Sequence, residues 1–211
     1  MAVNRSSPAS DAGHPRKRRT QAQRSAATRD ALIKAGTALF TKHGYVDTAR
    51  EDICARAGVT RGALDHHFDG KKGLFRAIVD DVEGRLNLKI AEAAMQQADP
   101  VEALRAGSHA YLAAATDPEV RRIILLDAKS VLGWDAWQEI HEQHGLALTR
   151  EGIRAAMAAG KVRERNPEPL AMVLLAALNE AALYVATADD PEAARAEARE
   201  TADRVLDAVL A

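Results

Sequence analysis

The sequence predicts an all-helical protein with about nine helices. Aromatic residues make up only 4% of the 211 residues, and the alternating β-branched runs of a sandwich or barrel are missing. Apolar residues recur instead three and four positions apart, which is helical spacing. Four prolines directly follow an acidic or amide residue, which is typical of a helix start because proline lacks an N–H that would be unsatisfied there. These pairs are Asp99-Pro100, Asp117-Pro118, Asn166-Pro167 and Asp190-Pro191.

In chain order, the first helix ends at Gly44 and carries its apolar residues on one face: Leu32, Ala35, Gly36, Leu39 and Phe40. Two short helices follow at 49–57 and 60–68, and a long helix then runs from Lys71 to the mid-90s. Further helices start at the capped prolines. Residues 134–160 form one long helix, or two helices broken near Gly145, and the last two helices span 167–186 and 191–210.

The composition argues against several classes of protein. Cys54 is the single cysteine, so neither an internal disulfide nor a four-cysteine zinc site is possible. Apolar runs such as 123–126 and 171–178 are much shorter than the roughly 20 residues of a membrane span. The residues after Met1 are polar and show no secretory signal. We therefore expect a cytoplasmic protein that does not interact with a membrane.

The formal net charge of −1 conceals an uneven distribution. Residues 1–75 carry a net charge of +7, and residues 76–211 carry −8. This asymmetry is typical of a front half that binds a polyanion, attached to an acidic body. Residues 1–25, with the basic cluster Arg16 to Arg19, are expected to be a disordered tail. This tail is either only solvated or an arm that touches DNA.

Residues 49–68 have the pattern of a helix-turn-helix. Thr48 and Glu51 have the spacing of a capping box, and Gly58 can adopt the left-handed conformation that ends a helix. Thr60 then caps a second short helix. Two short helices joined by such a turn form a helix-turn-helix. The second helix should turn Leu64 and Phe68 inward and the following residues outward: Arg61, Gly62, Ala63, Asp65 and His66.

Residues 26–86 resemble the DNA-binding domain of the TetR/AcrR family of bacterial transcriptional regulators. The matching residues have the family's order and spacing: Phe40, Gly44-Tyr45, Thr48, Ile53, Ala57-Gly58-Val59, Thr60-Arg61-Gly62, Leu64, His67-Phe68, Lys71 and Leu74-Phe75. Residues 87–211 resemble the family only in length, helical content and a final helix pair. The resemblance implies that they form a ligand-binding and dimerisation domain.

The resemblance also implies which residues contact DNA. It assigns phosphate contacts to Thr48, Thr60, His67 and Lys71, and base readout chiefly to Arg61, since arginine can bind guanine with two hydrogen bonds. The complete predicted set is Thr48, Arg50, Thr60, Arg61, Gly62, Ala63, His66, His67 and Lys71. Two residues depart from the family pattern: Asp65 stands where tyrosine is usual, and Glu51 where arginine is frequent.

A ligand-responsive repressor that binds a palindromic operator as a homodimer is the function that the resemblance implies. The two last helices would pair across a two-fold axis as a four-helix bundle, with Leu174, Leu178, Leu206 and Val209 as the larger contacts. The alternative is that both helices pack only within one chain. The long helix that starts near Lys71 would transmit ligand binding to the DNA-binding domain.

A pocket in the C-terminal half would be built from Tyr111, Asp127, Trp134, Trp137, His141 and Asn179. Such a pocket is apolar with a few polar groups, and suits a hydrophobic effector that carries one hydrogen-bonding or cationic group. The alternative is that the two tryptophans fill the core or a dimer contact.

Sequence signatures of catalysis and cofactor binding are missing: there is no G-x-G-x-x-G, no P-loop and no G-x-S-x-G. We therefore expect no enzymatic activity and no cofactor. His141, Glu142 and His144 lie on one helical stretch and supply too few ligands for a metal. The competing hypothesis is a helical adaptor that does not bind DNA, but it leaves the helix-turn-helix and the basic front half without a purpose.

Overall fold

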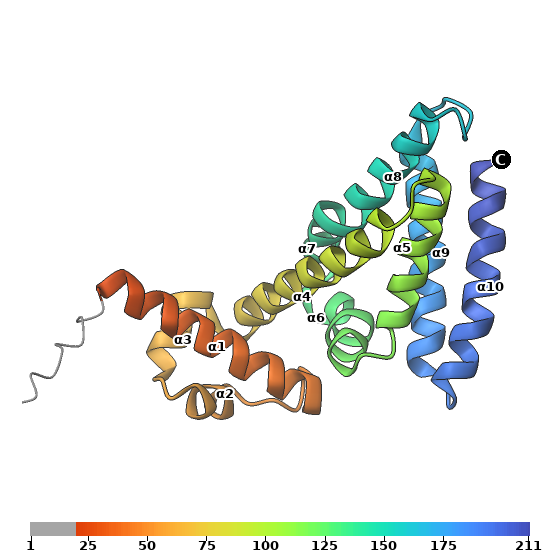
Figure 1. Cartoon of the computed structure of the whole chain (residues 1–211). Helices are drawn as coiled ribbons and strands as arrows, with labels where there is room; N and C mark the ends of the chain where they lie inside the picture. The colour runs from red at the N-terminus through yellow and green to blue at the C-terminus, as the bar shows by residue number, and fades with distance from the viewer. Residues whose placement is uncertain (1–19) are drawn as a thin grey trace, which may run out of the picture.

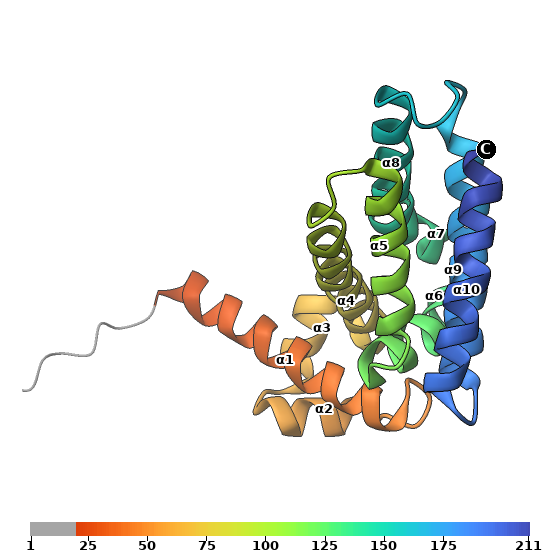
Figure 2. The ribbon, with the colours of Figure 1, turned by 45° about the vertical axis from the view of Figure 1, so that its right-hand side comes forward.

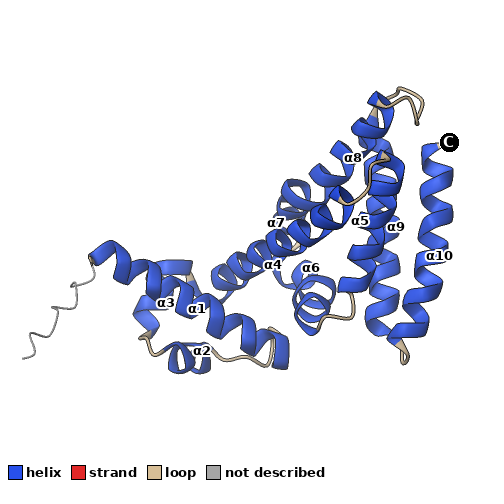
Figure 3. Ribbon diagram, viewed as in Figure 1, coloured by secondary structure: helices blue, strands red, loops and turns tan. Residues whose placement is uncertain are grey.

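The computed structural model describes residues 20–211. Its α-helices are α1 (Gln21–His43), α2 (Arg50–Ala57), α3 (Arg61–Phe68), α4 (Gly70–Met95), α5 (Pro100–Ala114), α6 (Lys129–Leu132), α7 (Trp134–His141), α8 (Ala147–Ala158), α9 (Pro167–Thr187) and α10 (Pro191–Leu210). A π-helical segment, Val120–Ala128, runs directly into α6, and another, Glu142–Leu146, joins α7 to α8. Residues 20–211 thus form nine continuous helical runs and contain no strand, which confirms the predicted class (Figure 3).

Helix α1 begins earlier than the sequence pattern indicated. The Thr20 hydroxyl accepts a hydrogen bond from the Gln23 N–H at 3.2 Å, and the Gln23 side chain accepts one from the Thr20 N–H at 2.9 Å. This capping box fixes the start of the helix at Gln21, so residues 21–25 are helical rather than part of the tail. The remainder of the predicted tail, with Arg16 to Arg19, lies outside the described residues.

The helix starts predicted from the proline pairs are confirmed. Asp99, Asn166 and Asp190 are the N-cap residues of α5, α9 and α10, and each side chain accepts a hydrogen bond from a backbone N–H of the first turn. The Asp117 carboxylate does the same for the N–H of Glu119, just ahead of the segment Val120–Ala128. Each acceptor satisfies a backbone donor that the helix itself leaves unpaired.

Helices α1, α2 and α3 and the first half of α4 form a small domain at the left of Figure 1. Its core contains five fully buried residues from all four helices: Leu32, Phe40, Ile53, Leu64 and Phe75. The rings of Phe40 and Phe75 meet edge to face, with their centroids 5.2 Å apart. Since α1, α2 and α3 together are too small to bury a core alone, the domain depends on α4 for its fourth side.

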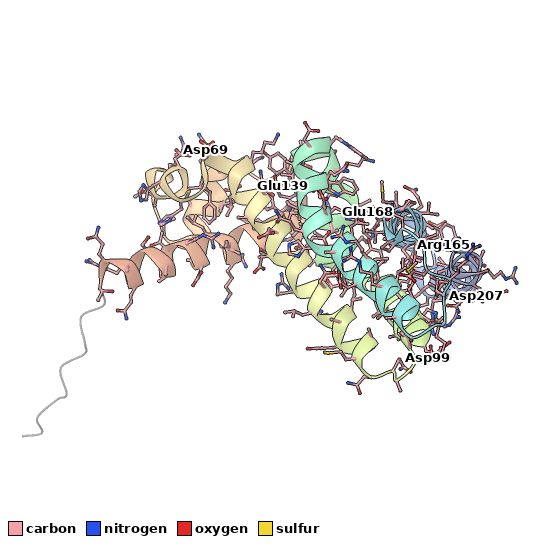
Figure 4. All side chains as sticks on the ribbon, turned by 90° about the horizontal axis from the view of Figure 1, so that it is seen from above. Asp69, Asp99, Glu139, Arg165, Glu168 and Asp207 are labelled. Carbon is pink, nitrogen blue, oxygen red and sulfur yellow. The ribbon has the colours of Figure 1, made fainter. Side chains whose placement is uncertain are left out.

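Helices α5, α8, α9 and α10 form the larger domain, in which α9 and α10 run antiparallel along the right-hand edge (Figures 1 and 2). The core of this domain includes Leu112, Ile153, Leu174, Leu178 and Leu206. In Figure 4 the α3–α4 junction at Asp69 lies toward one end of the molecule, and Asp207 on α10 lies toward the other. Helix α4 extends from the small domain along the larger one.

The leucines predicted to join two copies of the chain lie in this core instead. Leu174 and Leu206 are 1% exposed and Leu178 is 6% exposed, because they pack within their own chain. The outer face of α9 carries other apolar residues, among them Met172, Val173 and Tyr184, which are all more than half exposed.

Among residues 20–211, α9 is also the one helix long and apolar enough to span a membrane by length and composition. Core helices of other proteins pass the same test.

The predicted capping box between Thr48 and Glu51 is wrong. Helix α2 starts from Ala49, which offers no side-chain cap. The Thr48 side chain is 2% exposed, and its hydroxyl donates to the Gly44 carbonyl oxygen at 2.7 Å. The other two local predictions are confirmed: Gly58 ends α2 in the left-handed conformation, at φ 68°, and the Thr60 hydroxyl caps the Ala63 N–H at 3.3 Å.

Candidate nucleic-acid interface and internal cavity

Helix α3 presents one polar face to solvent, as predicted. Arg61, Gly62, Asp65 and His66 are exposed on this face, whereas Leu64 and Phe68 are buried against the small domain. Ala63 and His67 are half-buried between the two faces. The exposed face of α3 therefore offers the guanidinium group of Arg61 and the imidazole of His66 to a ligand as large as DNA. At Gly62 no side chain covers the helix backbone.

Two ion pairs connect the exposed faces of α2 and α3. Arg50 Nη1 lies 3.3 Å from Asp65 Oδ1, and Arg61 pairs with Glu51. The two residues that depart from the family pattern thus each hold a predicted DNA-contacting arginine. A backbone hydrogen bond and then the nearby arginines lower the pKa of the Glu51 carboxyl, so it is ionised at neutral pH.

These pairs orient the arginines without locking them. Each of the four side chains is more than two-fifths exposed, and exposed pairs contribute at most about 1 kcal/mol. A phosphate or a guanine edge can therefore replace either carboxylate as the partner of the guanidinium group. The ion pairs explain how two acidic residues fit on a surface that was expected to be basic.

The loop between α1 and α2 is closed by Lys71, a role that the sequence analysis missed. Its ammonium group donates to the carbonyl oxygens of Tyr45, at 2.8 Å, and Thr48, at 2.9 Å. It also lies 4.1 Å from the centre of the Tyr45 ring. Burial lowers the pKa of Lys71. Two of its three protons thus serve the loop. The Thr48 hydroxyl is buried and bonded to Gly44, so this hydroxyl is not free for the predicted phosphate contact.

Asp127 joins the two domains and does not line a pocket, contrary to prediction. Its Oδ2 accepts a hydrogen bond from the Tyr45 backbone N–H at 2.9 Å and another from Arg122 Nε at 3.1 Å. The Tyr45 ring in turn packs on Phe40 and Phe75 in the core of the small domain. One carboxylate therefore ties the loop that precedes the helix-turn-helix to the larger domain.

An internal cavity of about 150 Å³ lies between α4, α5, α8, α9 and the segment Glu142–Leu146. Most of its lining is apolar, including Leu86, Ile90, Leu104, Leu174 and Leu178. Three of the predicted pocket residues line it and bind one another. The Tyr111 hydroxyl donates to Asn179 Oδ1 at 2.6 Å, and the Asn179 amide lies 3.2 Å from His141 Nε2. Burial lowers the pKa of His141, so this ring is neutral and can accept the amide proton.

The predicted placement of the tryptophans in the cavity is wrong. Trp134 is 58% exposed and packs on Trp137, and the Lys129 ammonium lies within 5.4 Å of both ring centres. Trp137 stacks on His141 with the ring centres 4.6 Å apart but is not part of the cavity lining. Gly133, at φ 87°, ends α6 and redirects the chain, so α7 turns Trp134 toward solvent and leaves Trp137 half-buried against the hydrophobic core.

Glu83 is a buried acid in the cavity lining that the sequence analysis missed. It lies on α4, is 8% exposed and lines the cavity, and no side chain among residues 20–211 forms a hydrogen bond or ion pair with it. Burial raises its pKa to about 7, while nearby His144 lowers it and Asp80 raises it. The signal was present in the sequence, because Glu83 interrupts the apolar stripe of Val79, Val82 and Leu86.

Comparisons with known proteins identify the same family for both domains. The family described as "Bacterial regulatory proteins, tetR family" matches residues 32–78, and "Tetracyclin repressor-like, C-terminal domain" matches residues 101–209. The chain is 31% identical to the HTH-type transcriptional regulator TtgR of Pseudomonas putida over 147 residues, which are 68% of this chain and 70% of TtgR. It is 39% identical over 62 residues, 29% of each chain, to the HTH-type transcriptional repressor BepR of Brucella suis.

Among solved structures, a TetR-family transcriptional regulator from Pectobacterium atrosepticum superposes with a TM-score of 0.79 at 32% identity, over 91% of this chain and 98% of that one. The fold and the exposed helix-turn-helix thus define a DNA-binding transcriptional regulator, not an enzyme. The chain belongs to the TetR family of bacterial regulators. Family membership also removes the alternative of an adaptor that does not bind DNA.

Replacing Glu83 by glutamine should stabilise the protein in a pH-dependent way. In the unfolded chain this carboxyl loses its proton near its ordinary pKa of 4.5, but in the folded protein it keeps the proton up to about pH 7. Wild-type stability therefore falls as the pH rises across this window, and a glutamine avoids the loss. In urea unfolding, Glu83→Gln should add about 3 kcal/mol near pH 8 and less than about 1 kcal/mol near pH 5.

The matched control is Glu92→Gln, the same change at an exposed position of α4 outside the cavity lining, which should leave the stability unchanged at both pH values. An equal gain for Glu83→Gln at both pH values would show that the effect comes from packing and not from the buried charge.

Proposed function

We propose that this protein is a cytoplasmic, ligand-responsive repressor that binds a palindromic DNA operator as a homodimer and is released by a small hydrophobic effector. The observation that carries the proposal is the position of α4, which supplies residues to the core of the DNA-binding domain and to the lining of the internal cavity. The name of BepR describes that relative as a repressor, which supports repression as the mode of action here.

DNA readout is assigned to the exposed face of α3. Arg61 would bind a base edge in the major groove, and the open space around Gly62 would let the helix backbone approach the DNA. Thr60 at the start of α3, Arg50, His66 and His67 would contact phosphates or flanking bases, and the small side chain of Ala63 would leave room beside them. In a dimer, two such helices would enter successive major grooves about 34–36 Å apart.

The homodimer is assigned to the outer faces of α9 and α10. Met172, Val173, Ala176 and Tyr184 are exposed on the same side of α9, around the single charged residue Glu180, which leaves a largely apolar stripe facing solvent in the single chain. Exposed apolar stripes of this kind mark interaction surfaces. Pairing two copies across a two-fold axis would cover both stripes at once and form a four-helix bundle.

Loss of the Arg61 side chain should reduce sequence-specific binding. The test is gel retardation on a duplex selected by the wild-type protein from a random library, at several salt concentrations. Arg61→Ala should cost about 1–3 kcal/mol and relax the preference at one base pair in each half-site. Arg163→Ala, which removes the same charge from an exposed position in the larger domain, serves as the control and should bind like wild type. If Arg61→Ala weakens all sequences equally, Arg61 contacts a phosphate and not a base.

The wild-type chain of 22.7 kDa should sediment as a dimer at micromolar concentration in the absence of DNA. Val173→Glu places a charge in the proposed dimer contact and should shift the protein to the monomer, because an unpaired charge would be buried there. Leu88→Glu makes the same change at an exposed apolar residue of α4 and should remain dimeric. A wild-type monomer, or a Val173→Glu dimer as tight as wild type, would contradict the assignment.

A further inference from the structure

The charges that line the internal cavity are unbalanced. Only two lining residues carry a formal charge, Glu83 and Glu151, and no lysine or arginine is among them. Glu151 forms an ion pair with Arg154 and is 66% exposed, so its charge is compensated at the rim. Glu83 is 8% exposed and has no hydrogen-bond or ion-pair partner among residues 20–211. The nearby imidazole of His144 is outside the lining and pairs with Asp80 at 2.9 Å. The cavity therefore presents one acid without an ion-pair partner.

The other polar groups of the cavity do not compensate Glu83. Tyr111 and Asn179 are hydrogen-bonded to each other, and the Asn179 amide is directed to His141. Burial, with a contribution from the Glu83 charge, raises the pKa of Tyr111, so this hydroxyl stays neutral. A buried carboxylate without a partner is costly, and the cost is removed only by a proton or by a cation that enters the cavity.

We propose that the effector of this protein is a small hydrophobic amine whose ammonium group pairs with the Glu83 carboxylate inside the cavity. This proposal rests on the ligand response proposed above and names the chemistry of the ligand. A cavity of about 150 Å³ with apolar walls holds a group of the size of one aromatic ring. The ring would pack against Leu86, Ile90 and Leu104, and the ammonium group would complete the charge balance at Glu83.

The same arrangement disfavours other classes of effector. A carboxylate or phosphate would bring a second negative charge next to Glu83 without a basic residue in the lining to receive it. A neutral ligand would fill the apolar space but leave the acid unpaired. Because Glu83 lies on α4, five residues after Ile78 in the core of the DNA-binding domain, an ion pair at this position would act directly on the helix that supports α3.

Isothermal titration at neutral pH with three probes of similar size tests the proposal. The probes are phenethylamine, 2-phenylethanol and phenylacetate, which carry a positive, a neutral and a negative group beside the same ring. We expect phenethylamine to bind the full-length protein at least about tenfold more tightly than 2-phenylethanol, and phenylacetate to bind least. The proposal is overturned if the amine binds no better than the alcohol, if the acid binds best, or if none of the three binds at millimolar concentration.

Three variants locate the amine. Glu83→Gln should remove the preference for phenethylamine and leave 2-phenylethanol within about twofold of wild type. Glu151→Gln makes the same change at the rim and should leave the preference intact. Glu83→Asp keeps the charge and should retain a preference for the amine over the alcohol, which guards against a folding defect in the glutamine variant. An amine preference that survives in Glu83→Gln overturns the assignment to this site.

Operator binding is measured on the same samples by fluorescence anisotropy. If phenethylamine binds through Glu83 and the operator stays bound, the amine site stands and the proposed ligand response fails. If the wild-type protein binds its operator and phenethylamine does not bind, the amine site fails and the DNA-binding function stands. The two proposals can therefore fail separately.

Discussion

The continuity of α4 is the constraint on which the rest of the structure depends. Residues at its start, including Phe75 and Ile78, complete the core of the DNA-binding domain, and Glu83 and Leu86 line the cavity. An unbroken helix has about 3.6 residues per turn, so these two environments are only about one and a half to three turns apart. A change in the position of α4 at the cavity cannot be absorbed within the helix and must reach α3, since close-packed interfaces do not deform gradually.

The junction around Tyr45 provides a second connection between the domains. Its backbone N–H binds Asp127 of the larger domain, its carbonyl accepts from Lys71 on α4, and its ring fills the core of the small domain. Tyr45 thus contacts both the larger domain and α4. On the DNA-facing surface, by contrast, the arginines are held only by exposed and readily exchanged ion pairs. The molecule combines a rigid junction with an adaptable binding face.

The sequence predicts the fold well because helix starts are decided locally: an acidic or amide cap followed by proline needs no distant partner. It also predicts that Arg61 and His66 face outward, because the spacing of Leu64 and Phe68 determines the inner face. The cavity was harder to predict. Asp127, Trp134 and Trp137 were placed there by spacing along one helix, but Gly133 redirects α7 and the Tyr45 amide captures Asp127. Glu83 was missed because its signal in the sequence, an acid within an apolar stripe, does not tell whether the side chain faces a cavity or solvent, which tertiary packing decides.

Amide hydrogen exchange of the full-length protein, with and without a selected operator duplex, tests the coupling through α4 most directly. The coupling requires that DNA bound at α3 also changes the stability of the Tyr45 loop and of the part of α4 that lines the cavity. We expect slower exchange in residues 50–68 to be accompanied by slower exchange at residues 44–48 and in the second half of α4, around residues 83–94. Protection confined to residues 50–68, with the loop and the cavity-lining part of α4 unchanged, would contradict a coupled pair of domains.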